Sequence, residues 1–413
     1  PGHYSPRLHE LPGPEKVAAH HGGRMDGTPA RIDTETAVRA RYEAAAKERE
    51  AALCCTVLYD PRWLERIPQE IKDKDYGCGD PSAYVREGDV VLDLGSGGGK
   101  ICYIAAQIVG KKGRVIGVDF NPEMLGLARK YRRDMAKTLG HDVVEFHRGR
   151  IQDLALPLDE VDAWLARHPV RSADDLARFE DFQADVRATR PMIADESVDV
   201  IISNCVLNLV GEGAREQLFR EMFRVLKRGG RVAISDIVSD EVVPDAMKRD
   251  AKLWSGCISG AFQEAEFLVA FERAGFHAVT LEKLDEQPWQ TVKGIEFRSA
   301  TVTARKGKQG DCWERNQAVI YKGPWKKVED DDGHVLHRGQ RMAVCDKTFR
   351  ILTGEPYGTE IVPVPPLKEV PLSRAKPFDC TRSDVRHPAE TKGKRYRKTA
   401  AGAAVCGPDG GCC

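Results

Sequence analysis

A glycine-rich run near residue 95 has the residue types and spacing of a cofactor-binding turn. The apolar stretch Val90–Leu94 leads into Gly95-Ser96-Gly97-Gly98-Gly99, and an amphipathic stretch follows, an order that predicts strand, tight turn and helix. Glycine tolerates positive φ and lets a ligand approach the backbone closely. A second apolar run, 114–119, ends in Asp119. The distance in sequence from the glycine turn to Asp119 is close to the roughly 20 residues after which an acid binds a ribose hydroxyl in nucleotide-binding folds. Together these features indicate a nucleoside-containing cofactor on a doubly wound α/β sheet.

The acid that opens the turn, Asp93, distinguishes two classes of cofactor. Dinucleotides place a pyrophosphate at the helix N-terminus, and a carboxylate at the head of the loop would repel it. The same carboxylate suits the ammonium group of a methionine moiety. The run Asp-Leu-Gly-Ser-Gly-Gly-Gly also resembles motif I of class I S-adenosylmethionine (AdoMet) methyltransferases. We therefore expect AdoMet rather than NAD; a strand–helix turn without a ligand is the remaining alternative.

Three cysteines share a setting that suits a soft, thiophilic centre. Cys78 precedes the first strand, Cys205 follows the fourth and Cys257 comes after the fifth, each in a loop beside Gly or Asn. Backbone amides in such loops are free to stabilise a thiolate, and three converging thiolates suit a soft ion. None of the three forms a C-x-x-C pair and no His stands nearby in sequence, which disfavours structural zinc. The alternative is that each cysteine is a small buried hydrophobe.

The elements that must position these residues alternate between strand and helix patterns. Further strands are expected at 143–146, 197–205 and 231–236, and helices at 34–53, 101–109 and 219–226. Ligands of open α/β sheets bind at the carboxyl ends of the strands, so Asn204, Cys205 and Asp236 are placed for chemistry. A charged stretch, about 155–195, is long for a strand–helix connection. We interpret it as an insertion that either covers the cofactor or contacts a partner.

The chain is expected to divide into five segments. We expect a mobile N-terminal arm at 1–33, a helical, cysteine-bearing segment at 34–80 and an AdoMet-binding domain at 81–260. A small accessory α+β module is expected at 261–355. Proline, lysine and arginine dominate thereafter, so 356–413 is expected to be a disordered basic tail.

Composition excludes several classes of function. Among 413 residues, 41% are hydrophobic and the net charge is +0, which provides a core and argues against a broad nucleic-acid or membrane-surface role. No apolar run is long enough to span a bilayer, and the first residues lack a signal-peptide core. We therefore expect a cytoplasmic protein. In that compartment its twelve cysteines point to metal, catalytic or redox roles rather than to a disulfide framework.

Four motifs carry a more specific resemblance. Tyr76-Gly77-Cys78-Gly79, the glycine turn, Ser203-Asn204-Cys205-Val206-Leu207-Asn208-Leu209 and Trp254-Ser255-Gly256-Cys257-Ile258-Ser259-Gly260 occur in the order typical of arsenite AdoMet methyltransferases, and the resemblance runs from about residue 38 to 352. It implies a class I methyltransferase fold in which Cys78, Cys205 and Cys257 bind trivalent arsenic. It also implies that Cys54 or Cys55 takes part in a disulfide relay with them. A terminal pair such as Cys412-Cys413 resembles the tails of some members, where it gathers or hands over the metalloid; the alternative is a tail without a role.

The resemblance also assigns cofactor residues. Asp93 would lie near the ammonium group, the turn against methionine and ribose, Asp119 on the ribose hydroxyls and Asn204 across the closing side. The full expected set is Tyr76, Asp93, Gly95, Ser96, Gly97, Asp119, Phe120, Met124, Arg150, Ile151 and Asn204. Met124, Arg150 and Ile151 are expected beside the adenine, although helix core is the alternative for Met124.

The expected activity is AdoMet-dependent methylation of thiol-bound arsenite in detoxification. Each transfer oxidises arsenic formally, so a thiol reductant, thioredoxin or glutathione, is expected to reset the cysteines. A monomer is expected. One alternative is methylation of an ordinary metabolite, which needs a base but no cysteine triad; another is a non-catalytic metalloid-sequestering protein. The motifs do not fix the number of methyl groups, or the preference among arsenite, methylarsenite, antimonite and selenium species.

Overall fold

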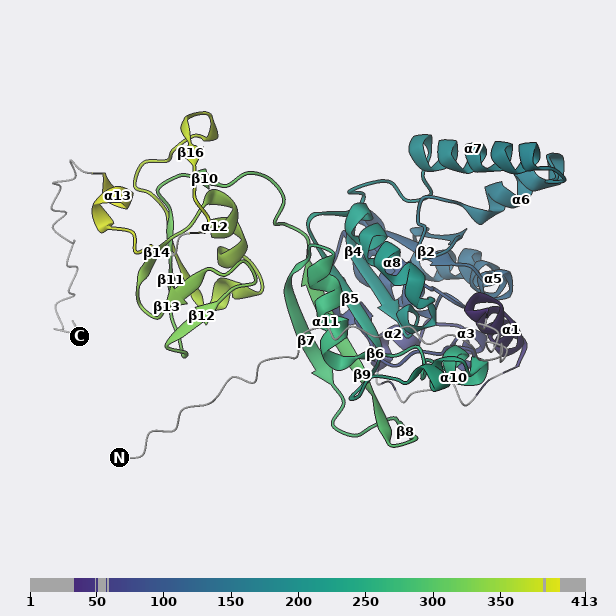
Figure 1. Ribbon diagram of the computed structural model, residues 1–413. Helices are drawn as coiled ribbons and strands as arrows, with labels where there is room; N and C mark the ends of the chain where they lie inside the picture. The colour runs from purple at the N-terminus through teal and green to yellow at the C-terminus, as the bar shows by residue number, and fades with distance from the viewer. Residues whose placement is uncertain (1–32, 49, 51–56, 58, 382–383, 394–413) are drawn as a thin grey trace, which may run out of the picture.

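A mixed β-sheet forms the centre of the larger of two structural units (Figure 1). The computed structural model describes residues 33–48, 50, 57, 59–381 and 384–393. Within them the main sheet has the order β3-β2-β1-β4-β5-β9-β7, with β6 beside β5 and β8 beside β9. Its strands are β1 (Val90–Leu94), β2 (Arg114–Asp119), β3 (Val144–Arg148), β4 (Val198–Asn204), β5 (Leu226–Ser239), β6 (Phe262–Gln263), β7 (His277–Leu284), β8 (Gln290–Val292) and β9 (Ile295–Arg305).

The parallel half of the sheet carries the cofactor turn. β1 lies parallel to both β2 and β4, so that Val91 pairs with Val115 on one side and with Val200 on the other. β9 lies antiparallel between β5 and β7. Such Val- and Ile-rich runs suit strands that are buried on both faces. From β1 the sheet extends through β2 and β3 on one side and through β4 and β5 on the other. The carboxyl end of β1 is therefore a topological switch point, where open α/β sheets bind ligands. This is the expected class I methyltransferase sheet.

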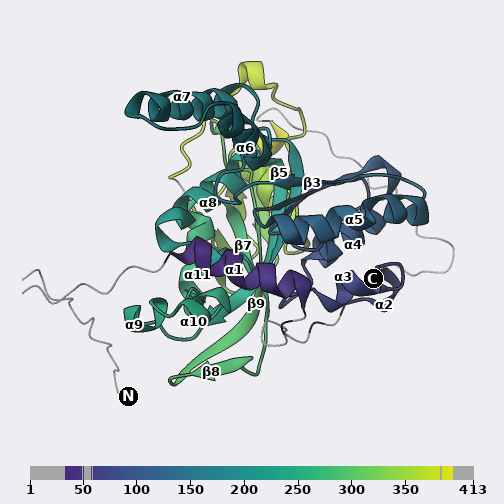
Figure 2. The same cartoon turned by 90° about the vertical axis from the view of Figure 1, so that its right-hand side faces the viewer.

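Helices cover both faces of this sheet, and each face has its own apolar core. Val91 packs under α4 (Lys100–Val109) and α5 (Pro122–Leu139), whereas the next residue, Leu92, belongs to the core beneath α8 (Glu212–Val225) and α11 (Glu264–Arg273). Figure 2 shows the two pairs of helices on opposite sides of the sheet. The alternation follows from the two-residue period of a strand. Asn121 caps α5 and Pro122 begins it, as the sequence predicts.

The charged stretch after β3 forms a helical hairpin that projects from the sheet (Figure 1). Its helices are α6 (Leu158–Arg167) and α7 (Ala173–Thr189). Trp164 joins them, because its ring stacks on Phe182 with 5.1 Å between centroids and lies 5.4 Å from Phe179. The expected insertion is therefore an ordered hairpin with a small aromatic core of its own.

The remaining helices of the larger unit are short, apart from the first. They are α1 (Thr34–Lys47), α2 (Pro61–Leu64), α3 (Gln69–Asp73), α9 (Asp245–Lys248) and α10 (Ala251–Ser255). α1 follows its N-cap Asp33 and ends at Lys47, before the predicted limit of residue 53. Among the described residues, no helix combines the length and the apolar character that crossing a membrane requires.

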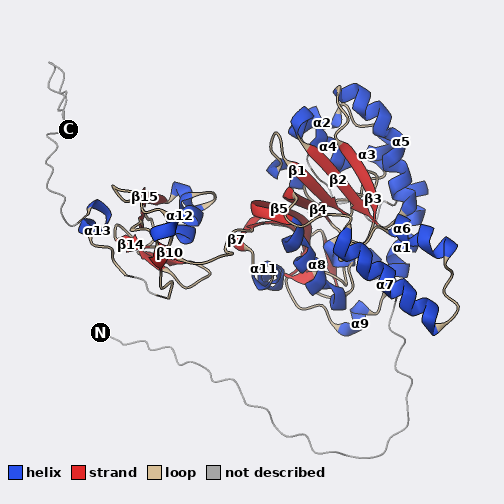
Figure 3. Cartoon of the chain, turned by 90° about the horizontal axis from the view of Figure 1, so that it is seen from above, coloured by secondary structure: helices blue, strands red, loops and turns tan. Residues whose placement is uncertain are grey.

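A second, smaller unit follows β9 and lies beyond β7, away from α1 and α6 (Figure 3). Its elements are β10 (Trp313–Glu314), β11 (Ala318–Tyr321), β12 (Lys327–Glu329), β13 (Val335–His337), β14 (Arg341–Ala343), α12 (Asp346–Thr353), β15 (Ile361–Val364), β16 (Lys376–Pro377) and α13 (Pro388–Lys392). Glu355 joins the two units through ion pairs with Arg86 and, at 2.8 Å, with Arg305.

Both domain boundaries expected in this region differ from the structure. Residues 261–305 belong to the main sheet rather than to the accessory module, because β9 pairs along β5 from Arg231 to Ser239. The segment after 356 is not a featureless tail up to residue 393, since β15 pairs with β11 and β16 pairs with β10. Its proline-rich composition reflects strand edges and turns, where proline is tolerated.

Candidate functional site

A cavity of about 370 Å³ opens at the carboxyl ends of β1, β2 and β4. Every residue expected to bind the cofactor lines it: Tyr76, Asp93, Gly95, Ser96, Gly97, Asp119, Phe120, Met124, Arg150, Ile151 and Asn204. The cysteine Cys205 lines the same cavity. The residues predicted from separate motifs therefore meet in one place.

Hydrogen bonds to β2 hold the glycine turn in place. The amides of Gly95 and Ser96 donate to the carbonyl of Val118 at 2.8 and 3.1 Å, and the amide of Gly97 donates to the Asp119 carboxylate at 2.8 Å. Gly95 has φ of 71°, and a Cβ there would overlap the side chain of Val206. A residue other than glycine would therefore disturb the turn and the loop that follows β4.

Two buried carboxylates face this cavity. Asp93 is 2% exposed and accepts a hydrogen bond from the thiol of Cys102 at 3.2 Å. Burial raises the pKa of Asp93 to about 7, because the charged form loses its hydration. Burial likewise raises the pKa of Asp119 above its ordinary value, against the opposing hydrogen bonds from Asn121 and Gly97. A cationic group entering the cavity would favour the ionised form of Asp93.

The polar atoms of the cavity fit a nucleoside with an amino-acid tail. Within the described part of the chain, Ser96 Oγ and Asn121 Nδ2 are buried without a hydrogen-bond partner, and both residues line the cavity. Unpaired buried donors and acceptors are costly, so these atoms are available to hydroxyl and amino groups of a ligand. Together with Asp93 and Asp119 they form a donor and acceptor set that suits AdoMet.

Helix α1 forms a wall of this cavity that the sequence analysis did not foresee. Glu35, Val38 and Tyr42 line the cavity from one face of the helix. Glu35 makes a bidentate ion pair with Arg150, with the closer contact at 2.7 Å. Tyr76 fixes the other end of α1, because its hydroxyl donates to the carbonyl of Ala45 at 2.9 Å. The spacing of residues 35, 38 and 42 was the available signal, since it places them on one helical face.

Beside the cofactor cavity lies a second hollow of about 320 Å³. Glu35, Phe120 and Arg150 line both spaces, and Val161 and Phe179 line the second from the α6–α7 hairpin. The insertion therefore lies next to the cofactor cavity rather than across it.

The three predicted cysteines come together, but in a different redox state from the one expected. Cys78 and Cys205 are joined by a disulfide bond, and the thiol of Cys257 donates to the carbonyl of Cys205 at 3.4 Å. The prediction of three free thiolates therefore differs from the structure, since two neighbouring sulfurs have closed on each other. Cys54 and Cys55, expected in the relay, and Cys412 and Cys413 lie outside the described residues.

Asn204 and Tyr59 hold the loop that carries Cys78. The Asn204 Oδ1 atom accepts from the amides of Cys78 and Gly79 at 2.8 and 3.1 Å, and its Nδ2 atom donates to Gly79 O at 2.6 Å. Tyr59 also donates to Gly79 O, at 3.1 Å. Asn204 thus positions a cysteine as well as lining the cofactor cavity, and no motif had indicated Tyr59.

We expect Gly77→Ala to displace this loop and to lower both stability and activity. A Cβ at Gly77 would overlap Asn204 Nδ2, and such overpacking costs about 1–3 kcal/mol. Gly126→Ala is the matched control, because its Cβ would meet nothing within 4 Å and it lies on α5, where alanine is favoured by about 1 kcal/mol. Urea unfolding and catalytic turnover would be measured on both variants. Equal behaviour of the two would contradict the proposed role of the loop.

Cys205 and Cys257 share an uncommon backbone conformation. Their φ angles are 58° and 61°, in the left-handed region, which costs a residue with a side chain roughly 1–3 kcal/mol. An apolar cluster that includes Val243, Met247 and Phe297 packs against the three cysteines. Backbone strain and dry packing at one point are typical of functional sites.

Asp236 is the charged neighbour of this cluster. Its carboxylate and the sulfurs of Cys78 and Cys205 lie within 4.8 Å of one another. Asn208 donates to it through Nδ2 at 2.7 Å, and burial raises the pKa of Asp236 to about 7. The sequence analysis placed Asp236 at a strand end, positioned for chemistry of an unspecified kind, and the structure places it against the disulfide.

Comparisons with known proteins agree with this site. Residues 86–186 and 170–275 match a family described as a methyltransferase domain, and residues 308–396 match a domain of unknown function. An arsenite methyltransferase of Aquipseudomonas alcaligenes is 30% identical over 325 residues, which cover 74% of this chain and 83% of the relative. The chain belongs to the arsenite methyltransferase family. The mouse member is 27% identical over 364 residues, with 85% of this chain and 86% of that protein covered.

The resemblance within the arsenite methyltransferase family extends to the fold. A crystal structure of an arsenic(III) S-adenosylmethionine methyltransferase from Chlamydomonas reinhardtii shares 25% identity, with a TM-score of 0.51, and covers 77% of this chain and 98% of that one. S-adenosylmethionine is therefore the cofactor expected in the present chain as well. The two carboxylates and the unpaired polar atoms of its cavity fit this cofactor.

Proposed function

We propose that this protein methylates trivalent arsenic, with S-adenosylmethionine as the methyl donor and Cys78, Cys205 and Cys257 as the arsenic ligands. One observation carries the proposal: Cys205 belongs to the cysteine cluster and also lines the cofactor cavity. The two reactants would therefore meet at Cys205 without any intervening element. Detoxification of arsenic is the corresponding biological role.

The cavity residues would bind and orient the cofactor. Asp93 would hold the ammonium group, Asp119 the ribose hydroxyls, and Ser96 Oγ a further polar group. Met124 and Ile151 would pack beside the adenine, and Arg150 would remain paired with Glu35 on α1. When bound, AdoMet supplies a sulfonium methyl group as the electrophile.

The cysteines would hold arsenic as a pyramidal trithiolate. Arsenous acid condenses with three thiols, so that three As–S bonds replace three As–OH bonds and three water molecules leave, without any change in oxidation state. Soft thiolates are the preferred ligands of such a centre. Arsenic keeps a lone pair, which is the nucleophile, so no general base has to remove a proton. The apolar packing around the cluster would exclude water from the reaction.

A thiol reductant is the second co-substrate of this proposal. The disulfide between Cys78 and Cys205 must accept two electrons before either sulfur can bind arsenic, and methyl transfer raises the formal oxidation state of arsenic by two. One dithiol or two monothiols supply each pair of electrons by thiol–disulfide exchange, so the two pairs need two dithiols or four monothiols. We assign that role to thioredoxin or glutathione, with Cys54 or Cys55 as the relay. A reducing compartment, the cytoplasm, and a monomeric protein complete the proposal.

Product analysis tests the proposed function. The purified, reduced protein would be incubated with arsenite, AdoMet and a thiol, and arsenic species would be separated and quantified by mass spectrometry. Methylated arsenic that requires all three components is the expected result. Bound AdoMet with unchanged arsenite would overturn the proposal and favour methylation of an ordinary metabolite; arsenite binding without AdoMet binding would favour sequestration.

A further inference from the structure

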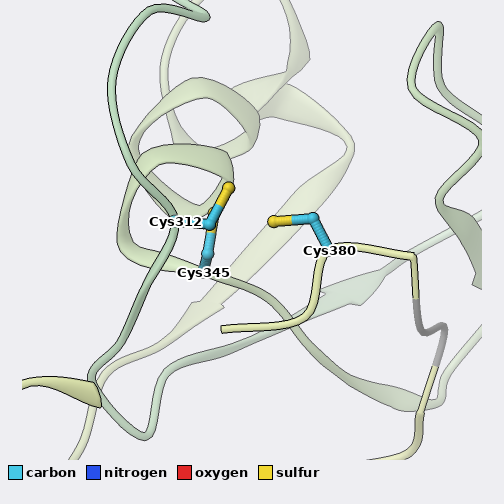
Figure 4. A group of neighbouring side chains, drawn as sticks. All are labelled: Cys312, Cys345 and Cys380. Carbon is cyan, nitrogen blue, oxygen red and sulfur yellow. The ribbon is translucent and has the colours of Figure 1, made fainter. Parts of the chain in front are cut away.

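Three cysteines of the small unit point toward one another (Figure 4). The sulfur atoms of Cys312, Cys345 and Cys380 all lie within 4.8 Å of one another, and the three thiols are free. Cys345 is buried, whereas Cys312 and Cys380 are partly exposed, so a small ion can reach the cluster from solvent.

Three separate segments bring these cysteines together. β10 follows Cys312 and pairs with β16, which precedes Cys380, and the amide of Phe378 donates to the carbonyl of Cys312 at 2.8 Å. Cys345 caps α12. Arg315 links the Cys312 segment to this helix through a 2.6 Å ion pair with Asp346. The cluster is therefore built into the fold of the small unit rather than formed by mobile side chains.

The environment of the cluster favours thiolate at one position and opposes it at another. Burial alone would raise the pKa of Cys345, but the hydrogen bonds with Thr348 and with the thiols of Cys380 and Cys312 together outweigh it and leave the pKa below its ordinary value. Burial and the neighbouring thiols raise the pKa of Cys380 well above its ordinary value. A thiophilic centre bound to the three sulfurs would lower the pKa of Cys380, because it stabilises the thiolate form.

We propose that Cys312, Cys345 and Cys380 form a second binding site for trivalent arsenic, held by three thiolates in the small unit. The number of sulfur ligands favours trivalent arsenic over zinc. Zinc in structural sites takes four ligands, whereas the described residues supply three sulfurs, the number that trivalent arsenic requires. Binding follows the same balance as above: three thiols and arsenous acid give three As–S bonds and three water molecules, with no redox step.

This site is separate from the cofactor cavity. The residues that line the cavity end at Ala214, and the small unit lies on the far side of β7 from α1 (Figures 1 and 3). Arsenic bound at the second site would therefore be stored rather than methylated there. The inference goes beyond the proposed function and rests on it only in taking arsenite as a ligand that the protein meets.

Arsenic stoichiometry tests the second site without AdoMet. The full chain would be reduced with a phosphine, incubated with arsenite, freed of unbound arsenic and analysed for arsenic per chain. Cys380→Ser and Cys312→Ser are each expected to remove about one bound arsenic relative to the unmodified chain, whereas Cys102→Ser, which removes a free buried cysteine of α4, serves as control and should remove none. The Cys257→Ser variant should still bind arsenic at the second site, and its X-ray absorption spectrum should show arsenic with three sulfur neighbours.

Distinct outcomes separate this proposal from the proposed function. Unchanged stoichiometry in both small-unit variants would overturn the second site, whether or not arsenite is methylated. Zinc in the purified protein that is lost in Cys380→Ser would also overturn it, in favour of a structural zinc site. Failure of methylation with arsenic still lost from both small-unit variants would instead leave the second site standing. Because Cys312 and Cys380 are partly exposed, circular dichroism is expected to show folded variants.

Discussion

Replacing Cys257 is expected to abolish arsenite methylation while leaving AdoMet binding intact. Cys257 lies outside the disulfide and is not among the residues that line the cofactor cavity, so its replacement removes one proposed arsenic ligand and leaves the cavity-lining residues and the disulfide cysteines in place. An oxygen ligand is a poor substitute for a thiolate on a soft centre. We expect Cys257→Ser to lose at least about 100-fold in turnover, or about 2.7 kcal/mol of transition-state stabilisation.

Cys257→Gly separates chemistry from folding at the same position. The φ of 61° at Cys257 is strained for a residue with a side chain and free for glycine. The relief of roughly 1 kcal/mol offsets part of the packing that is lost with the sulfur. Turnover by product speciation, AdoMet affinity by calorimetry and the thermal midpoint would be measured for both variants. Full turnover in either one would remove Cys257 from the arsenic site.

Asp93→Asn is expected to weaken AdoMet binding and to remove its dependence on pH near neutrality. The pKa of Asp93 is raised to about 7, so the carboxyl is largely neutral below that pH and charged above it. An ammonium group prefers the charged form. Affinity in the unmodified protein should therefore rise with pH up to about 7, by at most about tenfold per pH unit, and the asparagine variant should bind weakly and evenly across this range.

Calorimetry between pH 5.5 and 7 measures this effect, with a surface carboxylate as control. Asp134 lies on α5, is 72% exposed at its side chain and pairs with Lys137, so Asp134→Asn should keep both the affinity and its pH profile. A profile that persists in Asp93→Asn would assign the titration to another group and remove Asp93 from the ammonium site.

Local motifs indicated residues that line the cavity, because these residues are concentrated in short segments. The glycine turn and Asp119 lie at the ends of β1 and β2, which are neighbours in the sheet, so strand order alone brings them together. The α1 wall could not be predicted in the same way. Its contact with the cavity depends on Glu35 meeting Arg150, 115 residues away, and helix periodicity does not say what a helix packs against.

For the cysteines too, the sequence predicted some features and not others. The family resemblance implied that Cys78, Cys205 and Cys257 meet in one site, but the disulfide depends on distances that the sequence does not carry. Cys312, Cys345 and Cys380 were not grouped, since their spacing matches no metal motif and β10 meets β16 only in the folded unit. The boundary near residue 261 failed because a strand pattern does not reveal which sheet the strand joins.

The backbone contacts of Cys78 have a consequence for how the protein is made. The carbonyl of Cys78 accepts a hydrogen bond from Ser299 on β9 at 2.6 Å, and Cys205 lies 127 residues after Cys78. A ribosome synthesises the chain from its N-terminus, so Cys78 emerges long before the strand that holds its loop. The loop of Cys78 can therefore reach its folded position only after β9 has been translated, so the proposed arsenic site is completed late in synthesis.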